Sequence, residues 1–141
     1  MNGTVEQIAI SPEESVLPGA VAAVEVRAEG VVGDRHGEAG DITLIEAEAL
    51  EAFTAETGIE LTHEESRRQL LTRGVRLNDL VGKRFTVGEV ECLGRELCEP
   101  CNHLQSLTRP GVLRGMVHRA GLNADIVAPG RIAVGDEVSG A

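Results

Sequence analysis

The chain has to build its hydrophobic core almost entirely from aliphatic side chains. Of its 141 residues, two are phenylalanine and none is tryptophan or tyrosine. Valine, isoleucine, leucine and alanine must therefore fill the interior. The same shortage removes the aromatic platforms on which proteins that bind single strands without sequence preference stack the bases. A function of that kind is not expected.

The length and the charge of the chain limit its domain count and its partners. A chain of 141 residues fits one domain, spanning 1–141, and can bury roughly two thirds of the surface that its unfolded form exposes. Its net charge of −10 repels phosphate backbones, which proteins bind through lysine and arginine. We therefore expect no nucleic-acid partner.

Signals for membranes and export are missing from the sequence. No apolar run approaches the ~20 residues that span a bilayer. The first ten residues, MNGTVEQIAI, lack the basic and long apolar regions of a secretory signal. Three cysteines, an odd number, do not suit a disulfide framework. These features predict a cytoplasmic protein with no membrane partner.

Short strands separated by glycine-rich turns are expected over much of the chain. Val24 and Val26 alternate with charged residues, which is the period of a half-buried strand. Residues 30–41 contain four glycines, too many for a stable helix, and are expected to form a loop. The stretches 82–89 and 130–136 each run from an apolar strand into a turn of glycine and an acidic residue. This pattern predicts hairpins in a compact barrel.

Helices are expected at three places. Residues 46–58 combine strong helix formers with a final glycine, and acidic residues after His63 suit the first turn of a short helix. A strand is expected to follow at 69–72. Residues 108–121 predict a further helix, with Arg114 and His118 four apart on its polar face.

These elements together predict the fold class. We expect one β-rich α/β domain, in which seven or eight short strands form a barrel or rolled sheet and two or three helices pack outside it.

The stretch RELCEPCNHL, residues 95–104, is the main candidate for chemistry. Cys98, Cys101 and His103 could bind zinc, but a structural zinc site normally has a fourth ligand from a second pair. Cys98 and Cys101 could instead form a redox pair. In a third interpretation Cys101 is a reactive thiolate with His103 beside it, and Cys98 packs in the interior. Cys92 has strand spacing and is expected to be buried.

A group of residues outside that stretch could converge on one anionic ligand. Arginine favours planar, bidentate contacts with phosphate or carboxylate. Each of these residues could also be an ordinary surface or paired side chain, and it is their occurrence together with Cys101 in an acidic chain that favours binding. The candidates are Arg35, His36, Arg68, Thr72 and Arg73.

Five ordered motifs make the chain resemble a small stand-alone member of the MOSC family, named after the C-terminal domain of molybdenum-cofactor sulfurases. The resemblance covers the chain from about residue 30 to the end. The motifs are GDRHG (33–37), DITLIE (41–46), RRQLLTRGVRLNDLVGKRF (67–85), ELCEPCNHL (96–104) and GVLRGMVHRAGL (111–122).

The resemblance implies a barrel-like fold that handles molybdenum cofactor or sulfur destined for metal centres. It places the reactive or molybdenum-ligating thiolate at Cys101, with Cys98 and His103 in the same motif. Arg35, Arg68 and Arg73 would then surround the phosphate of the cofactor's pterin. The domain of larger relatives that binds pyridoxal phosphate has no counterpart here, so that cofactor is not expected.

Three functions stay open on these grounds. The chain could be an enzyme that reduces N-hydroxylated compounds with electrons from a partner protein. It could be a non-catalytic carrier that receives cofactor or sulfur from a donor protein. It could also be a small zinc-binding structural domain built on Cys98, Cys101 and His103.

Overall fold

The structure is a computed structural model. It describes residues 2–13, 16–35, 40–99, 108 and 110–140.

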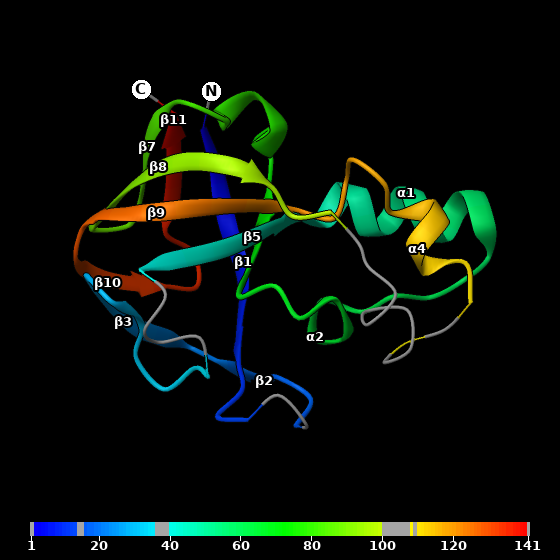
Figure 1. Cartoon of the computed structure of the whole chain (residues 1–141), viewed down its shortest axis with the longest axis horizontal. Coiled ribbons are helices and arrows are strands. Elements are labelled where there is room, and N and C mark those ends of the chain that lie inside the picture. Colours follow the sequence, from blue (N-terminus) through cyan, green and yellow to red (C-terminus); the bar gives the residue numbers. More distant parts are fainter. Residues whose placement is uncertain (1, 14–15, 36–39, 100–107, 109, 141) are drawn as a thin grey trace.

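Seven strands close into a barrel, as Figure 1 shows. Their order is β11-β7-β8-β9-β5-β6-β1, and pairing between β1 and β11 closes the ring. Neighbours are antiparallel except β5 and β6, which are parallel because helices connect them on the outside. The strands are β1 (Asn2–Ile10), β5 (Asp41–Glu46), β6 (Leu70–Arg73), β7 (Arg84–Val87), β8 (Val90–Leu97), β9 (Leu122–Ala128) and β11 (Glu137–Gly140).

The described residues form four further short strands. β2 (Gly19–Val21) pairs with β1, and a separate sheet has the order β10 (Gly130–Ala133), β3 (Ala23–Arg27), β4 (Gly30–Val31). The hairpin expected at 82–89 is confirmed as β7 and β8. The one expected at 130–136 is wrong, because β10 pairs with β3 whereas β11 joins the barrel. The sequence pattern predicts where the chain turns, but which strand each strand pairs with depends on the whole fold.

The core is aliphatic, as the composition predicts. The barrel interior holds side chains such as Leu44, Leu70 and Leu122, each fully buried, with Phe85 and the buried Cys92 among them. A second cluster lies outside the barrel. Its buried members are Ile45, Leu50, Phe53, Leu61, Val112, Met116 and Ala120.

α1 and α4 lie side by side at one end of the barrel in Figure 1. α1 (Ala47–Thr57) ends at Gly58, as predicted, and the structure shows that Gly58 has the left-handed conformation. α2 (His63–Ser66) begins with a capping box between Thr62 and Glu65. The described residues also form the 3₁₀ helix η1 (Leu77–Leu80) and α4 (Val112–Gly115).

The helix expected over 108–121 is much shorter in the structure. α4 ends at Gly115, and His118 adopts a left-handed φ of 63° that a helix does not contain. A side chain at Gly115 would lie 2.2 Å from the ring of Phe53, so the glycine lets α4 approach α1. Arg114 and His118 therefore do not share a helix face.

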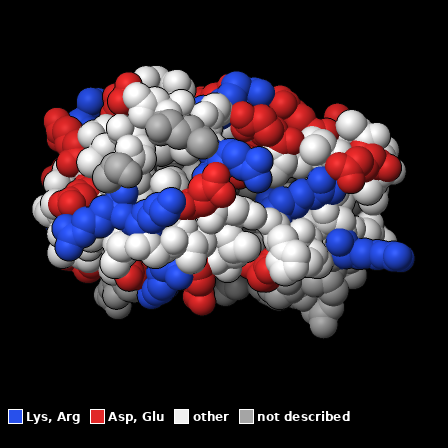
Figure 2. Space-filling model, turned by 90° about the horizontal axis from the view of Figure 1, so that it is seen from above, with Lys and Arg blue, Asp and Glu red and all other residues white. Residues whose placement is uncertain are grey.

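No helix in the described part of the chain is long and apolar enough to cross a membrane. On the face shown in Figure 2, basic and acidic side chains of the described residues are interspersed. That face offers no broad patch of a single sign.

Candidate functional site

The structure describes three of the predicted site residues around the cysteine stretch, and it brings two of them, Arg68 and Cys98, close together. Cys98 follows the end of β8, Arg68 lies between α2 and β6, and Arg35 follows β4. His36, Cys101 and His103 lie outside the described residues. One set of contacts runs from Arg35 through Asp34 to Gln69, the residue after Arg68. A second set attaches Arg68 and Cys98 to neighbouring main-chain oxygens after α4.

The first set of contacts begins at Asp34, which is buried beside Arg35. Its Oδ1 accepts a hydrogen bond from the main-chain nitrogen of Ser11 at 2.8 Å, and its Oδ2 accepts one from Nε2 of Gln69 at 2.9 Å. The other end of the Gln69 amide accepts from the main-chain nitrogen of Thr43 at 2.9 Å. The turn after β4 is thus attached to the residue that follows β1 and, through Gln69 just before β6, to β5.

The guanidinium of Arg35 lies in this network, but not all of its N–H groups have a hydrogen-bond partner among the described residues. Its side chain is only 13% exposed, and Nη1 lies 3.9 Å from Oδ1 of Asp34. Its Nε is buried and has no hydrogen-bond partner among the described residues. A buried donor without an acceptor costs about 1–3 kcal/mol, so we expect this nitrogen to bond to an acceptor from outside the described residues.

The Nε atom of Arg68 is hydrogen-bonded, while its two terminal nitrogens have no partner among the described residues. Nε donates to the main-chain oxygen of Ala120 at 2.8 Å. Within the described part of the chain, no acceptor is bonded to either terminal nitrogen. The half-buried guanidinium therefore presents two N–H pairs to its surroundings.

Cys98 lies in the electrostatic field of Arg68. Its main-chain nitrogen donates to the oxygen of Gly121 at 2.8 Å, next to the Ala120 oxygen that holds Arg68. Burial raises the pKa of the Cys98 thiol, Arg68 opposes that rise, and Asp41 adds to it. Cys98 is therefore protonated at neutral pH, and the pKa of its thiol depends on the Arg68 guanidinium.

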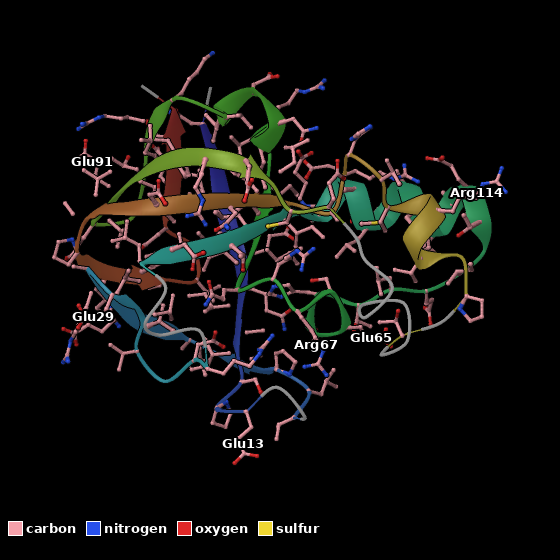
Figure 3. The ribbon with its side chains drawn as sticks, viewed as in Figure 1. Glu13, Glu29, Glu65, Arg67, Glu91 and Arg114 are labelled. Carbon is pink, nitrogen blue, oxygen red and sulfur yellow. The ribbon has the colours of Figure 1, made fainter. Side chains whose placement is uncertain are left out.

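Strained backbone gathers at this point. Arg67 and His118 are the two non-glycine residues with positive φ in the described part of the chain, at 60° and 63°. Arg67 directly precedes Arg68, and His118 lies two residues before Ala120. Such conformations cost about 1–3 kcal/mol each and cluster at functional sites. Figure 3 shows Arg67 beside α2, and its Nη1 donates to the main-chain oxygen of Val16 at 3.3 Å.

Thr72 and Arg73 are not part of this group. Thr72 is fully buried, and its hydroxyl is directed at the main-chain oxygen of Ile45 at 3.5 Å. Arg73, at the far end of β6 from Arg68, forms ion pairs with Glu6 and Glu51. These pairs occupy the guanidinium that the sequence assigned to an anionic ligand.

Sequence reasoning missed the residues that assemble the site. Gln69 was assigned only to a strand. Its position as a polar residue between Arg68 and an apolar strand could have marked it as a residue of the candidate site. The carbonyl of Ala120 and the amide of Ser11 carried no signal, because any residue supplies a main-chain atom. Among the described residues, no cluster of three or more histidine, cysteine or acidic side chains could hold a metal. Since Cys101 and His103 lie outside those residues, the zinc interpretation is untested.

We expect Arg68→Gln to raise the pKa of Cys98, because the mutation removes a positive charge that stabilises the thiolate. The measurement is the iodoacetamide alkylation rate of Cys98 in native protein as a function of pH, followed by peptide mass spectrometry. The midpoint of the profile should move to higher pH in Arg68→Gln. It should not move in Arg84→Gln, which removes an exposed guanidinium paired with Glu91 on β7. An unchanged midpoint in Arg68→Gln would contradict the proximity of the two side chains.

Comparison with known families identifies the family of the chain. The family model described as MOSC domain matches residues 32–139. The chain belongs to the MOSC domain family. Its barrel, with few helices and one domain, is the β-rich α/β fold that the sequence motifs predicted. The match covers Arg35, Arg68 and Cys98, and family membership associates this MOSC chain with molybdenum-cofactor or sulfur-transfer functions in general.

Solved structures share the fold at low sequence identity. The YUAD protein from Bacillus subtilis superimposes with a TM-score of 0.86 at 16% identity, over 98% of this chain and 94% of that one. YiiM from Geobacillus stearothermophilus gives 0.77 at 14% identity, over 99% and 75% of the two chains. YiiM from Escherichia coli gives 0.75 at 16%, over 100% and 70%. No curated protein sequence matches the chain significantly. At such identities the likeness establishes the fold of this MOSC domain and not its activity.

Proposed function

We propose that this MOSC domain binds molybdenum cofactor, with Arg35 and Arg68 holding the phosphate of its pterin and Cys101 contacting the metal or carrying sulfur. One observation supports the proposal above the others. Two guanidiniums have N–H groups that no described residue accepts: that of Arg68, which acts on Cys98, and that of Arg35, whose neighbour Asp34 is bonded to Gln69, the residue after Arg68. Forked guanidinium donors match the oxygens of a phosphate.

The residues that are present fit an anionic group. The buried Nε of Arg35 needs an acceptor, and phosphate oxygens are strong acceptors. Asp34 limits the net positive charge, but its carboxylate is already bonded to Ser11 and Gln69. Asp34 therefore orients the loop that carries Arg35 and leaves the guanidinium for the ligand. His36, the next residue along this loop, would add a donor.

In this proposal the thiol of Cys98 is neutral and the thiol of Cys101 is reactive. The raised pKa of Cys98 keeps that sulfur protonated, which makes it a poor nucleophile and a poor metal ligand. Cys101 is the thiolate we assign to the metal or to sulfur, since soft thiolates suit both tasks. His103 would stabilise its negative charge, and Cys98 would support the entry to the cysteine stretch.

An enzyme and a carrier would differ in the step after binding. When bound, the cofactor supplies a redox-active metal, and reduction of N-hydroxylated compounds with an electron-donor protein is the reaction we propose for the enzyme. The carrier would receive cofactor or sulfur from a donor protein and pass it on. Turnover of an N-hydroxylated base with an artificial electron donor separates the two. The cytoplasm is the compartment we propose for either.

We expect Arg68→Gln to lose most of the cofactor that copurifies with the protein. Hydrogen bonds to charged groups contribute about 1.5–3 kcal/mol, so the loss should be roughly 10- to 100-fold in affinity. The measurement is the pterin content of protein made in a host that synthesises the cofactor, quantified by fluorescence after oxidation. Arg84→Gln, which removes an exposed arginine on β7, should keep the parental content. Equal content in Arg68→Gln and the parent would contradict the proposal.

A further inference from the structure

A surface cavity of about 340 Å³ lies beside the hairpin of β3 and β4 and the turn that follows it. Its lining includes Arg27 at the end of β3, Glu29 in the hairpin turn, and Asp34 and Arg35 after β4. A water molecule occupies ~30 Å³ in the liquid, and pockets for small molecules begin at roughly 300 Å³. The cavity therefore has room for more than a single phosphate group.

The main chain of Arg35 is fixed against the residue that follows β1. Its nitrogen donates to the oxygen of Ser11 at 2.8 Å, and the nitrogen of Ser11 donates back to the carboxylate of Asp34. The turn after β4 contains Gly33 at a φ of 91°, where an added Cβ would lie 3.2 Å from Cδ1 of Ile10. The side chain of Arg35 thus starts from a position that is set before a ligand arrives, which lowers the entropic cost of binding.

Arg27 lines the same cavity from the other strand of the hairpin. Its main chain is paired with Gly30, the first residue of β4, so it lies opposite the segment that leads to Arg35. Arg27 is exposed, and its guanidinium forms no hydrogen bond or ion pair with a described residue. Nε of Arg35 is buried and also has no acceptor in the described part of the chain. Both arginines of the lining therefore have N–H donors to offer to a ligand.

The two acidic residues of the lining oppose these positive charges only in part. The side chain of Asp34 is 2% exposed, and its two oxygens accept hydrogen bonds from Ser11 and Gln69. Glu29 is exposed, and water weakens the interaction of its carboxylate with an ion in the cavity. The lining therefore favours an anion, which Glu29 repels weakly.

We propose that this cavity binds an anion with two linked phosphate groups, with Arg35 contacting one group and Arg27 the other. Each guanidinium carries a fork of N–H donors that matches the oxygens of one phosphate. The inference rests on the proposed function in one respect, namely that Arg35 binds an anion. It adds Arg27, which no sequence motif singled out, and a ligand larger than a single phosphate.

Isothermal titration calorimetry of the full chain with pyrophosphate, in buffer without divalent cations, tests the proposal. Arg27→Gln removes charged donors and should bind pyrophosphate roughly tenfold more weakly than the parent, or weaker still. Its affinity for inorganic phosphate should fall less, because Arg35 alone can hold one group. Glu29→Gln removes a repelling charge and should bind pyrophosphate about two- to threefold more tightly. Arg131→Gln is the control, since Arg131 is exposed on β10 of the same small sheet but does not line the cavity, and it should stay within about twofold of the parent.

The source of the two phosphate groups is decided by a second titration, with ADP. ADP that binds more tightly than pyrophosphate identifies a diphosphate ester as the ligand, and ADP that binds more weakly identifies inorganic diphosphate. Either result supports the cavity as the site, provided that Arg27→Gln weakens the binding of the tighter ligand.

The outcomes separate this inference from the proposed function. Pyrophosphate binding that is unchanged in Arg27→Gln but lost in Arg35→Gln overturns the role of Arg27 and leaves Arg35 as an anion-binding residue. A parent protein that binds neither pyrophosphate nor ADP overturns the inference as a whole, whereas the pterin content of Arg68→Gln tests the proposed function independently. If Arg27→Gln does not fold by circular dichroism, Glu29→Gln still decides, because binding that is no tighter than in the parent contradicts an anion in this cavity.

Discussion

Replacing Gly121 with alanine is expected to lower the free energy of unfolding by about 3 kcal/mol or more. Gly121 has a φ of 115°, which is unfavourable for any residue with a Cβ, and an added Cβ would lie 2.2 Å from the main-chain oxygen of Leu44. Neither backbone can move freely, because β5 and β9 are paired there. The melting temperature should fall by roughly 10 °C.

The same mutation should disturb the site, because the Gly121 oxygen accepts the hydrogen bond from Cys98. Thermal unfolding by circular dichroism measures the stability loss, and the alkylation rate of Cys98 in the native protein reports the local change. Gly19→Ala is the matched control, since nothing lies within 4 Å of its added Cβ and its φ is not positive. It should unfold within about 0.5 kcal/mol of the parent. Equal stability of both variants would refute the close contact between Gly121 and Leu44.

Local patterns were enough to predict most of the elements. Alternation at Val24 and Val26 identified β3, and helix formers ending at Gly58 identified α1, because both signals arise within a few residues of the chain. Strand pairing at 130–136 and the end of α4 were wrong. Both depend on distant partners, β3 for β10 and the ring of Phe53 for Gly115, which no local window contains.

Part of the candidate site could also be recognised from local features, namely residue type and motif. Arg35, Arg68 and Cys98 were singled out by residue type and motif, and the structure places Arg68 near Cys98. Arg73 has the same chemistry but is paired with Glu6 and Glu51, and its neighbours could not be known before the register of β1 and β6 was fixed. The contact between Arg68 and the carbonyl of Ala120 could not be predicted from residue types, because every residue has a main-chain carbonyl.

Loss of molybdenum in Cys101→Ser is the second large effect we expect. The hydroxyl of serine is a hard, neutral ligand at physiological pH and does not replace a soft thiolate. Cys98→Ser should retain most of the metal, since the raised pKa of Cys98 keeps its sulfur protonated. Cys92→Ala is the control for removing a thiol, because Cys92 is enclosed in the barrel and burial raises the pKa of its thiol to about 12.

Elemental analysis of these four proteins, made in a host that synthesises molybdenum cofactor, tests the central claim most directly. We predict metal in the parent, comparable content in Cys92→Ala, a modest reduction in Cys98→Ser, and a loss of at least tenfold in Cys101→Ser. Molybdenum retained at the parental level in Cys101→Ser, or a parent protein that carries none from such a host, would contradict the account.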